Sequence, residues 1–293
     1  MTLLLPLLAF ISGWGLASTP YIGHFRRFFS SILARFFIPF VIVYNMVYYQ
    51  AGSLALMAFS FCSALLVYGY FVYVFKDRLL ALCASYVNLA WLGFPFALAI
   101  FGHEISSAMI ALYVGGSIFG NVCSVTAVSK APQSFGVILK KVLKSPPVIA
   151  LIIAALCRLI HLQDVPEPNW ILQLYQFAKL GMIFTGMSVL GMWLKHTQIL
   201  KQDLIHSLKV MLPKLVLGAI ICSLTYYFIA TPTMQNYIGL MFFLFCLPPA
   251  ANIVAIETHY QGTGESARYI AAGTVVSIFM IAIFAVIWHF IAR

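Results

Sequence analysis

The chain has very few charged residues. Only 8% of its 293 residues are charged, and seven of them are acidic, whereas a soluble domain carries about 25% charged residues. Because 63% of the residues are hydrophobic and the mean hydropathy is +0.99, we predict an integral membrane protein. The apolar stretches are continuous and do not alternate in period two, which disfavours a β-barrel and predicts an all-α fold.

The sequence also lacks the motifs of enzymes and metal proteins. It contains no HExxH, no GxSxG and no pair of aspartates inside an apolar stretch. The cysteines are scattered singly, with no CxxC or other metal-ligand spacing, so they read as small packing residues. We therefore predict neither an enzyme nor a bound cofactor or metal. The six cysteines are Cys62, Cys83, Cys123, Cys157, Cys222 and Cys246.

Long hydrophobic runs are abundant instead. A membrane-spanning helix needs about 20 apolar residues, and ten stretches approach this length. We predict ten spans at about 3–20, 32–49, 54–75, 82–101, 107–128, 146–163, 172–194, 209–230, 236–258 and 267–290.

Basic residues are distributed unequally between the loops. With ten spans, all but three of the 17 Lys and Arg residues fall in or beside the loops of one face, Lys214 among them. The other face carries only Arg158 and Arg293, while Lys179 lies within a span. Basic loops mark the cytoplasm, so we predict a multi-pass cell (inner or plasma) membrane protein with both termini outside. The net charge of +10 then reflects topology and not nucleic-acid binding. A signal peptide at residues 1–18 is the weaker alternative, because a basic n-region is missing.

The longest polar stretch, 129–145, divides the chain into two halves of five spans, 1–128 and 146–293. An odd number of spans inverts the second half relative to the first, as in transporters with inverted repeats. Weak internal similarity agrees with this division: "FGHEISSA" and "YQGTGESA" follow the fourth and ninth spans, and "SIF" recurs in the fifth and tenth.

The fourth and ninth spans carry helix-breaking residues at corresponding places. An internal proline costs about 3 kcal/mol or more, and in lipid such a break survives only inside protein or beside an aqueous cavity. We expect two broken helices that cross near the midplane, where their N-terminal ends favour an anion; packing kinks are the alternative. The candidate substrate-binding residues are Asn88, Gly93, Pro95, Pro248, Pro249 and Asn252.

Other polar groups in the spans are few. Asn45 and Asn121 are further candidate substrate-binding residues, although intramembrane asparagines also hold helices together. Lys179 and Glu257 have a possible charge role, because an ionisable group in a span is a functional hypothesis by default; both could instead snorkel to an interface. Trp91, between Asn88 and Pro95, either packs or lines a cavity.

Four motifs resemble the auxin efflux carrier family, which includes bacterial malonate and malate permease-like carriers and plant PIN proteins. They are "FIPFVIVYNMVYY" (37–49), "NLAWLGFPFALAIFG" (88–102), "FTGMSVLGMWL" (184–194) and "LPPAANIVAIETHYQG" (247–262). The second, with its Asn-x-x-x-x-Gly-x-Pro pattern, is the most specific. The likeness covers most of the chain. The central loop is shorter than in many plant members, and the doubled proline is not a feature that the family requires.

The resemblance implies the fold of bile-acid symporters and of the sodium/proton antiporter NhaA. It implies a scaffold domain from spans 1, 2, 6 and 7, a transport domain from spans 3–5 and 8–10, elevator-type alternating access and a homodimer. It also places Asn88, Gly93 and Pro95 in one crossover and Pro248 with Asn252 in the other.

These observations predict a secondary transporter for small organic anions such as mono- or dicarboxylates. Membrane potential alone can drive export of an anion, because moving one charge yields about 2.3 kcal/mol per 100 mV. A sodium-coupled symporter of the bile-acid type is the first alternative. A membrane receptor that binds its ligand without moving it is the second.

Overall fold

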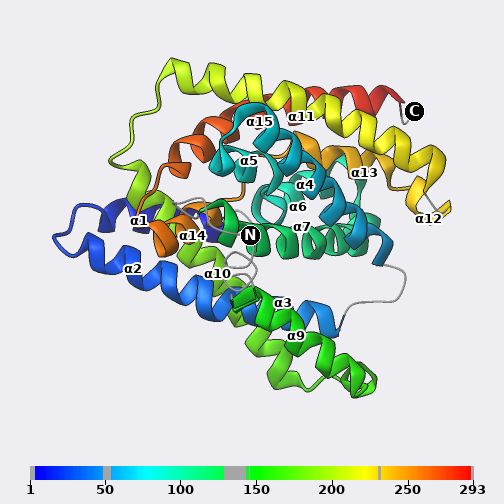
Figure 1. Cartoon of the computed structure of the whole chain (residues 1–293), viewed down its shortest axis with the longest axis horizontal. Helices are drawn as coiled ribbons and strands as arrows, with labels where there is room; N and C mark the ends of the chain where they lie inside the picture. Colours follow the sequence, from blue (N-terminus) through cyan, green and yellow to red (C-terminus); the bar gives the residue numbers. More distant parts are fainter. Residues whose placement is uncertain (1–3, 49–53, 129–142, 145, 230–231, 292–293) are drawn as a thin grey trace. The chain divides into compact units, whose positions relative to one another are not determined.

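The described part of the chain is almost entirely helical (Figure 1). The computed structural model describes residues 4–48, 54–128, 143–144, 146–229 and 232–291. Within these ranges the only β-pairing is one isolated antiparallel bridge, Val87 with Pro249. The α-helices are α1 (Leu4–Leu16), α2 (Ile22–Ile32), α3 (Ile38–Val47), α4 (Leu54–Phe75), α5 (Arg78–Ser85), α6 (Phe94–Phe101), α7 (Ser106–Ala127), α9 (Pro146–Leu159), α10 (Asn169–Leu194), α11 (Lys201–Phe228), α12 (Pro232–Gln235), α13 (Ile238–Phe243), α14 (Asn252–Gln261) and α15 (Ser266–Ile291). Short π- or 3₁₀-helices are η1 (Leu33–Phe37), η2 (Leu89–Gly93), η3 (His103–Ile105), η4 (Leu162–Asp164) and η5 (Leu244–Cys246).

Five helices are long and apolar enough to cross a membrane. They are Ile22–Val47, in which α2, η1 and α3 are continuous, then α4, α10, α11 and Ser266–Phe290 of α15. The prediction of an all-α protein is therefore confirmed for the described residues, and these helices indicate a membrane protein. The count of ten spans, the inverted repeat and the orientation of the termini stay predictions.

The chain divides into two compact units, each assembled from separate stretches. Unit 1 comprises Met1–Gln50, Gly120–Thr197 and Ala251–Ala267, and unit 2 comprises Ala51–Phe119, Gln198–Ala250 and Arg268–Arg293. Neither unit coincides with the sequence halves 1–128 and 146–293. Each takes helices from both, so contacts between residues far apart in the chain define the units.

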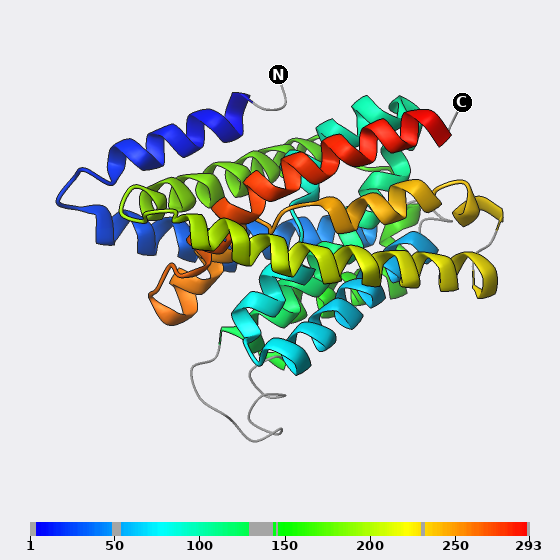
Figure 2. The ribbon, with the colours of Figure 1, turned by 90° about the horizontal axis from the view of Figure 1, so that it is seen from above.

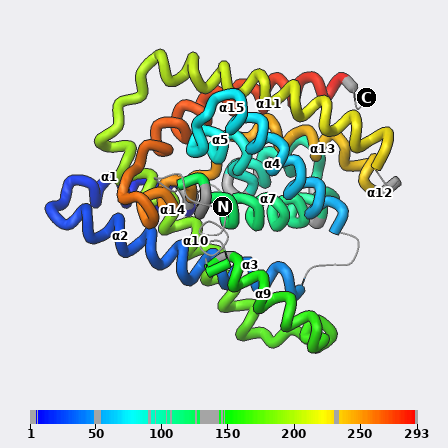
Figure 3. The backbone as a smooth tube through the Cα atoms, in the orientation of Figure 1, coloured from blue at the N-terminus to red at the C-terminus, as the bar shows by residue number. Residues whose placement is uncertain are grey.

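Close helix packing holds unit 1 together. α1 lies alongside α10 (Figure 2), and α3 packs against α9 (Figure 3). A Cβ atom at Gly13 would lie 2.0 Å from the carbonyl oxygen of Ser188, and one at Gly191 would lie 2.3 Å from that of Phe10. Small residues that let backbones approach are the usual device for packing helices in membranes.

In unit 2, a glycine allows the same close approach between α4 and α7. A Cβ atom at Gly115 would lie 2.1 Å from the carbonyl oxygen of Met57. Fully buried large side chains, including Phe71, Phe119 and Phe243, fill the interior. α4 also packs on α5, and α11 on α13, which places α11 beside the interrupted segments described below.

Two predicted span boundaries are wrong. The second helix begins at Ile22 instead of residue 32, and the eighth at Lys201 instead of residue 209. Hydropathy marks only the apolar part of a helix, whereas the helix continues into amphipathic turns whose charged residues lower the average. At the start of α11, the Leu200 N–H donates to the Asp203 carboxylate at 2.8 Å, which satisfies an N-terminal donor. Of the predicted linker 129–145, only residues 143 and 144 are described.

Candidate functional site

Both predicted segments are interrupted, but the prediction that Gly93 and Pro95 interrupt the fourth one is wrong, because Gly93 ends η2 and Pro95 lies in the first turn of α6. The fourth apolar segment is interrupted at residues 86–88 and the ninth at residues 247–251. A residue before proline is pushed out of the α conformation, so Pro248 and Pro249 together force extended backbone. Leu247 has φ −77° and ψ 148° accordingly. The break in the ninth segment is therefore a local consequence of two adjacent prolines.

The two interruptions satisfy each other's backbone groups. The Asn88 N–H donates to the Pro248 carbonyl at 2.8 Å, and the Ala250 N–H donates to the Tyr86 carbonyl at 2.9 Å. The Asn88 carbonyl accepts from the Gly93 N–H at 2.9 Å. In a membrane each unpaired backbone group would cost several kcal/mol, so this pairing is what makes the breaks tolerable.

Gly93 permits the close approach of the two segments. A Cβ atom at this position would lie 2.8 Å from Cδ1 of Leu247 and 3.2 Å from the Asn88 carbonyl oxygen. Because Leu247 is fully buried, its side chain has little room to yield. Gly93, in η2, thus has a packing role beside the break instead of forming part of it.

Lys214 is the side chain at the break that sequence reasoning missed. It lies on α11, is only 3% exposed, and its Nζ donates to the Leu247 carbonyl at 2.8 Å. The prediction grouped Lys214 with the residues that flank a loop, whereas α11 begins at Lys201 and Lys214 lies buried inside this helix. The run "LPKLVLG" (212–218) carried the signal, a single charge among apolar residues.

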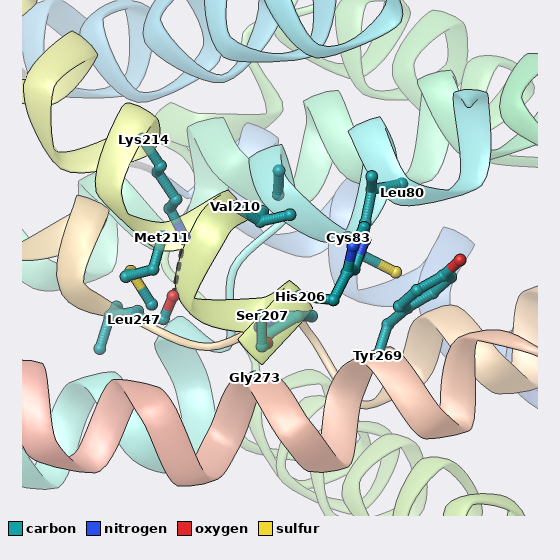
Figure 4. Close-up of a pocket in the computed structure, with 12 residues that line it drawn as sticks. Leu80, Cys83, His206, Ser207, Val210, Met211, Lys214, Leu247, Tyr269 and Gly273 are labelled. Carbon is teal, nitrogen blue, oxygen red and sulfur yellow. Dashed lines mark hydrogen bonds between the residues drawn. The ribbon is translucent and has the colours of Figure 1, made fainter. Parts of the chain in front are cut away.

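Two small cavities border Lys214 within unit 2. One has a volume of about 30 Å³ and is shown in Figure 4, where Nζ points to Leu247 and the rings of His206 and Tyr269 lie farther along the cavity. The other, of about 20 Å³, has polar lining from Ser60, Ser63 and Ser85. Each has room for about one water molecule, so a carboxylate can enter only if lining side chains move apart.

Lys214 has no carboxylate partner among the described residues. The two ion pairs found there are His161–Asp164 and Arg268–Asp203. A buried charge is normally paired, and an ammonium group has three donors, whereas here a single carbonyl acceptor is seen. The site therefore offers a buried lysine amine with unused donors beside two small, mostly apolar cavities that include a few serine hydroxyls.

The other predicted asparagines are distributed over both units. Asn88 lies at the break in unit 2, whereas Asn45, Asn121 and Asn252 belong to unit 1; all four are buried. Asn252 is the first residue of α14. Pro95 lies in the first turn of α6, and the side chains of Pro95 and Trp91 lie outside the described part of the structure.

Asn45 has local partners. Its Nδ2 donates to the Val41 carbonyl at 2.8 Å, and its Oδ1 accepts from the Tyr175 hydroxyl at 3.2 Å. The Tyr175 ring stacks on Tyr44 with centroids 3.8 Å apart. These contacts fit the helix-linking alternative for Asn45 better than substrate binding.

Glu257 does not snorkel to an interface. It is fully buried, and its carboxylate accepts from the Glu265 N–H at 2.8 Å, the Ser266 N–H at 2.9 Å and the hydroxyls of Thr263 and Ser266. A negative charge at a helix N-terminus is stabilising. Glu257 thus caps α15 and ties it to α14.

Lys179 is half-buried on α10 and forms no hydrogen bond or ion pair with a described residue. Nothing in the geometry assigns it a role. The described residues also contain no group of three or more His, Cys, Asp or Glu side chains placed to hold a metal ion.

Comparisons with known proteins leave the family open. No protein-family profile matches the chain, and no curated protein is significantly similar to it. The resemblance to auxin efflux carriers therefore rests on the four quoted motifs and stays a prediction.

Proposed function

We propose that this protein is a secondary transporter for small organic anions, with Lys214 as the cation that binds the substrate carboxylate. The observation that carries the proposal is a buried lysine side chain, with no carboxylate partner among the described residues, where the backbones of two interrupted segments pair. A carboxylate next to Lys214 would satisfy its remaining donors with charge-assisted hydrogen bonds. Asn88 and Gly93 shape the break that holds the site.

Backbone carbonyl groups at the break already accept hydrogen bonds, which leaves each of them one lone pair for a sodium ion. A sodium ion would need several oxygen ligands, as hard cations do. The carbonyls of Tyr86, Asn88 and Pro248 accept backbone N–H groups, and that of Leu247 accepts Lys214. An anion carrier driven by membrane potential needs no such ion site.

The interleaved composition of the two units supports a carrier with two domains. Unit 1 contains the first, second, sixth and seventh predicted spans, and most of unit 2 comes from the third to fifth and eighth to tenth. This grouping is the one implied for scaffold and transport domains by the resemblance to auxin efflux carriers. Alternating access of elevator type, ten spans, an inverted repeat and a homodimer belong to the same proposal.

The test is charge movement in sodium-free proteoliposomes challenged with mono- and dicarboxylates. The wild type is compared with Lys214→Gln, which removes the charge but keeps a donor, and with Lys209→Gln, an exposed lysine on the same helix. We expect Lys214→Gln to lower transport by about tenfold or more, because a charge-assisted hydrogen bond contributes about 1.5–3 kcal/mol. Lys209→Gln should transport as the wild type does.

Equal transport by Lys214→Gln and wild type would contradict the role of Lys214. Currents that appear only with sodium would favour the symporter. Binding of a carboxylate with no current or flux under either condition would favour the receptor.

A further inference from the structure

A larger cavity, of about 550 Å³, lies within unit 1. It is formed where α2, η1, α10 and α14 pack together. Its volume is in the range typical of small-molecule sites, about 300–1,000 Å³. The side chains that matter for its chemistry are Arg26, Arg27, Arg35, Trp193 and His259.

Three arginines face this cavity from one continuous helix. Arg27, Ser31 and Arg35 follow one another at four-residue spacing, which places them on one side of the helix. Arg27 and Arg35 are exposed, so both guanidinium groups are available to a ligand.

Arg26 is held in place at the cavity wall. Its guanidinium lies 3.8 Å from the ring centre of Trp193, and Nη2 donates to the Met192 carbonyl at 2.8 Å. The indole is fixed in turn, because its Nε1 donates to the Thr258 hydroxyl at 2.8 Å. The Arg26 Nε atom is buried and has no acceptor among the described residues. One donor of this ordered group is therefore still open.

His259 adds an imidazole to the three guanidinium groups of the cavity. It lies 3.3 Å from the Ser31 hydroxyl through Nδ1. Burial lowers its pKa, and the positive charge of Arg35 lowers it further. Its surroundings therefore favour the neutral imidazole, so His259 adds hydrogen-bonding capacity to the cavity and not a further charge.

Among the residues that the structure describes, no carboxylate lines the cavity to balance these charges. Glu257, which is close in sequence to Thr258 and His259 of the cavity, accepts hydrogen bonds from backbone N–H groups at the start of α15. Elsewhere the chain does supply a partner, since Arg268 pairs with Asp203 at 3.4 Å. Like charges in one cavity repel, so an anion from outside the chain would stabilise this arrangement.

We propose that this cavity binds a phosphate group, either in the headgroup of an anionic phospholipid or free in solution. Arginine forks match phosphate oxygens in bidentate pairs, and basic pockets between membrane helices are typical sites for phospholipid headgroups. Three guanidinium groups provide more charge than one carboxylate requires. The inference is independent of the transport proposal, which concerns Lys214 in unit 2.

The experiment measures binding to the purified protein in neutral detergent at fixed ionic strength. One arm titrates short-chain phosphatidylglycerol, with phosphatidylcholine as the zwitterionic control; the other titrates inorganic phosphate. Arg35→Gln and Arg27→Gln are compared with the wild type, and Lys201→Gln removes an exposed charge outside the cavity. We expect saturable binding in at least one arm, weakened about tenfold or more by each arginine variant and unchanged in Lys201→Gln.

The two arms identify the source of the phosphate. Binding of phosphatidylglycerol but not inorganic phosphate assigns a lipid headgroup, and the reverse assigns a soluble ligand. The proposal is overturned if neither ligand saturates, if phosphatidylcholine binds as tightly as phosphatidylglycerol, or if both arginine variants bind like the wild type. Since Arg27 and Arg35 are exposed, their replacement should leave the fold intact, which a size-exclusion profile checks.

Discussion

At the scale of single residues, two buried ionisable side chains, Glu257 and Lys214, differ in how many hydrogen-bond partners they have. Glu257 is surrounded by four donors, two of them backbone N–H groups at the start of α15. Lys214 has one carbonyl acceptor. The carboxylate is therefore satisfied by the fold itself, whereas the ammonium group keeps the capacity to bind something else.

The cap formed by Glu257 should be measurable as stability. Glu257→Gln removes the negative charge and turns one acceptor into a donor, so we expect a loss of about 1–3 kcal/mol. Thermal unfolding in detergent measures the change. Glu265→Gln is the matched control, because the Glu265 side chain is exposed and only its backbone N–H takes part in the cap. Equal melting temperatures for Glu257→Gln and wild type would contradict the assignment.

His259 should make stability fall under acidic conditions. Its pKa is below the ordinary value of about 6.5 because of burial and the charge of Arg35. The unfolded chain then takes up the proton first, so this contribution is complete above about pH 6.5 and is lost as the pH falls below it. Arg26 and Arg27 from α2 line the same cavity as His259, and the Tyr260 ring lies beside the imidazole.

The corresponding measurement is the melting temperature at pH 7.5 and pH 5.5. We expect the wild type to lose more than His259→Gln over this interval. His24→Gln, which replaces an exposed histidine, should behave as the wild type. The assignment fails if His259→Gln shows the same pH dependence as wild type.

At the scale of helices, contact between α1 and α10 depends on glycine. Gly13→Ala would place a methyl group 2.0 Å from the Ser188 carbonyl oxygen, so the two helices must separate. We expect a loss of about 1–3 kcal/mol, as for other overpacked sites. Gly15→Ala on the same helix meets nothing within 4 Å and should be neutral or stabilising. Thermal unfolding of the pair gives the comparison, and similar melting temperatures would exclude tight packing at Gly13.

The interruptions of the fourth and ninth apolar segments also have to be explained at the scale of helices. Prolines remove donors and push the preceding residue into extended backbone, so the interruption at residues 247–251 follows from local sequence. The interruption at residues 86–88 has no proline within it, and its backbone groups pair with the other break. Each segment therefore stabilises the irregular backbone of the other.

At the scale of the whole molecule, topology remains a prediction that labelling can test. Gln198→Cys and Asp164→Cys introduce thiols at exposed positions in loops predicted to lie on opposite faces. In a Cys62→Ser background, which removes the one exposed native cysteine among those described, a membrane-impermeant thiol reagent applied to intact cells should label Asp164→Cys and not Gln198→Cys. The opposite pattern would invert the orientation, and equal labelling would contradict the ten-span arrangement between these loops.

The sequence by itself determined the class of the protein, the presence of two irregular segments and the location of the second one. Composition and long apolar runs indicate membrane helices, and Pro248 with Pro249 marks a break, because both signals depend on nearby residues only. The sequence did not place Lys214 beside Leu247 or Glu257 at the start of α15, and it did not bring Arg35 and His259 to one cavity. Those neighbours are separated by 9 to 224 positions along the chain, and only the tertiary structure decides which helix faces meet. For the same reason the candidate anion sites could not be read from hydropathy, which averages over a helix and cannot tell a buried lysine from one at a helix end.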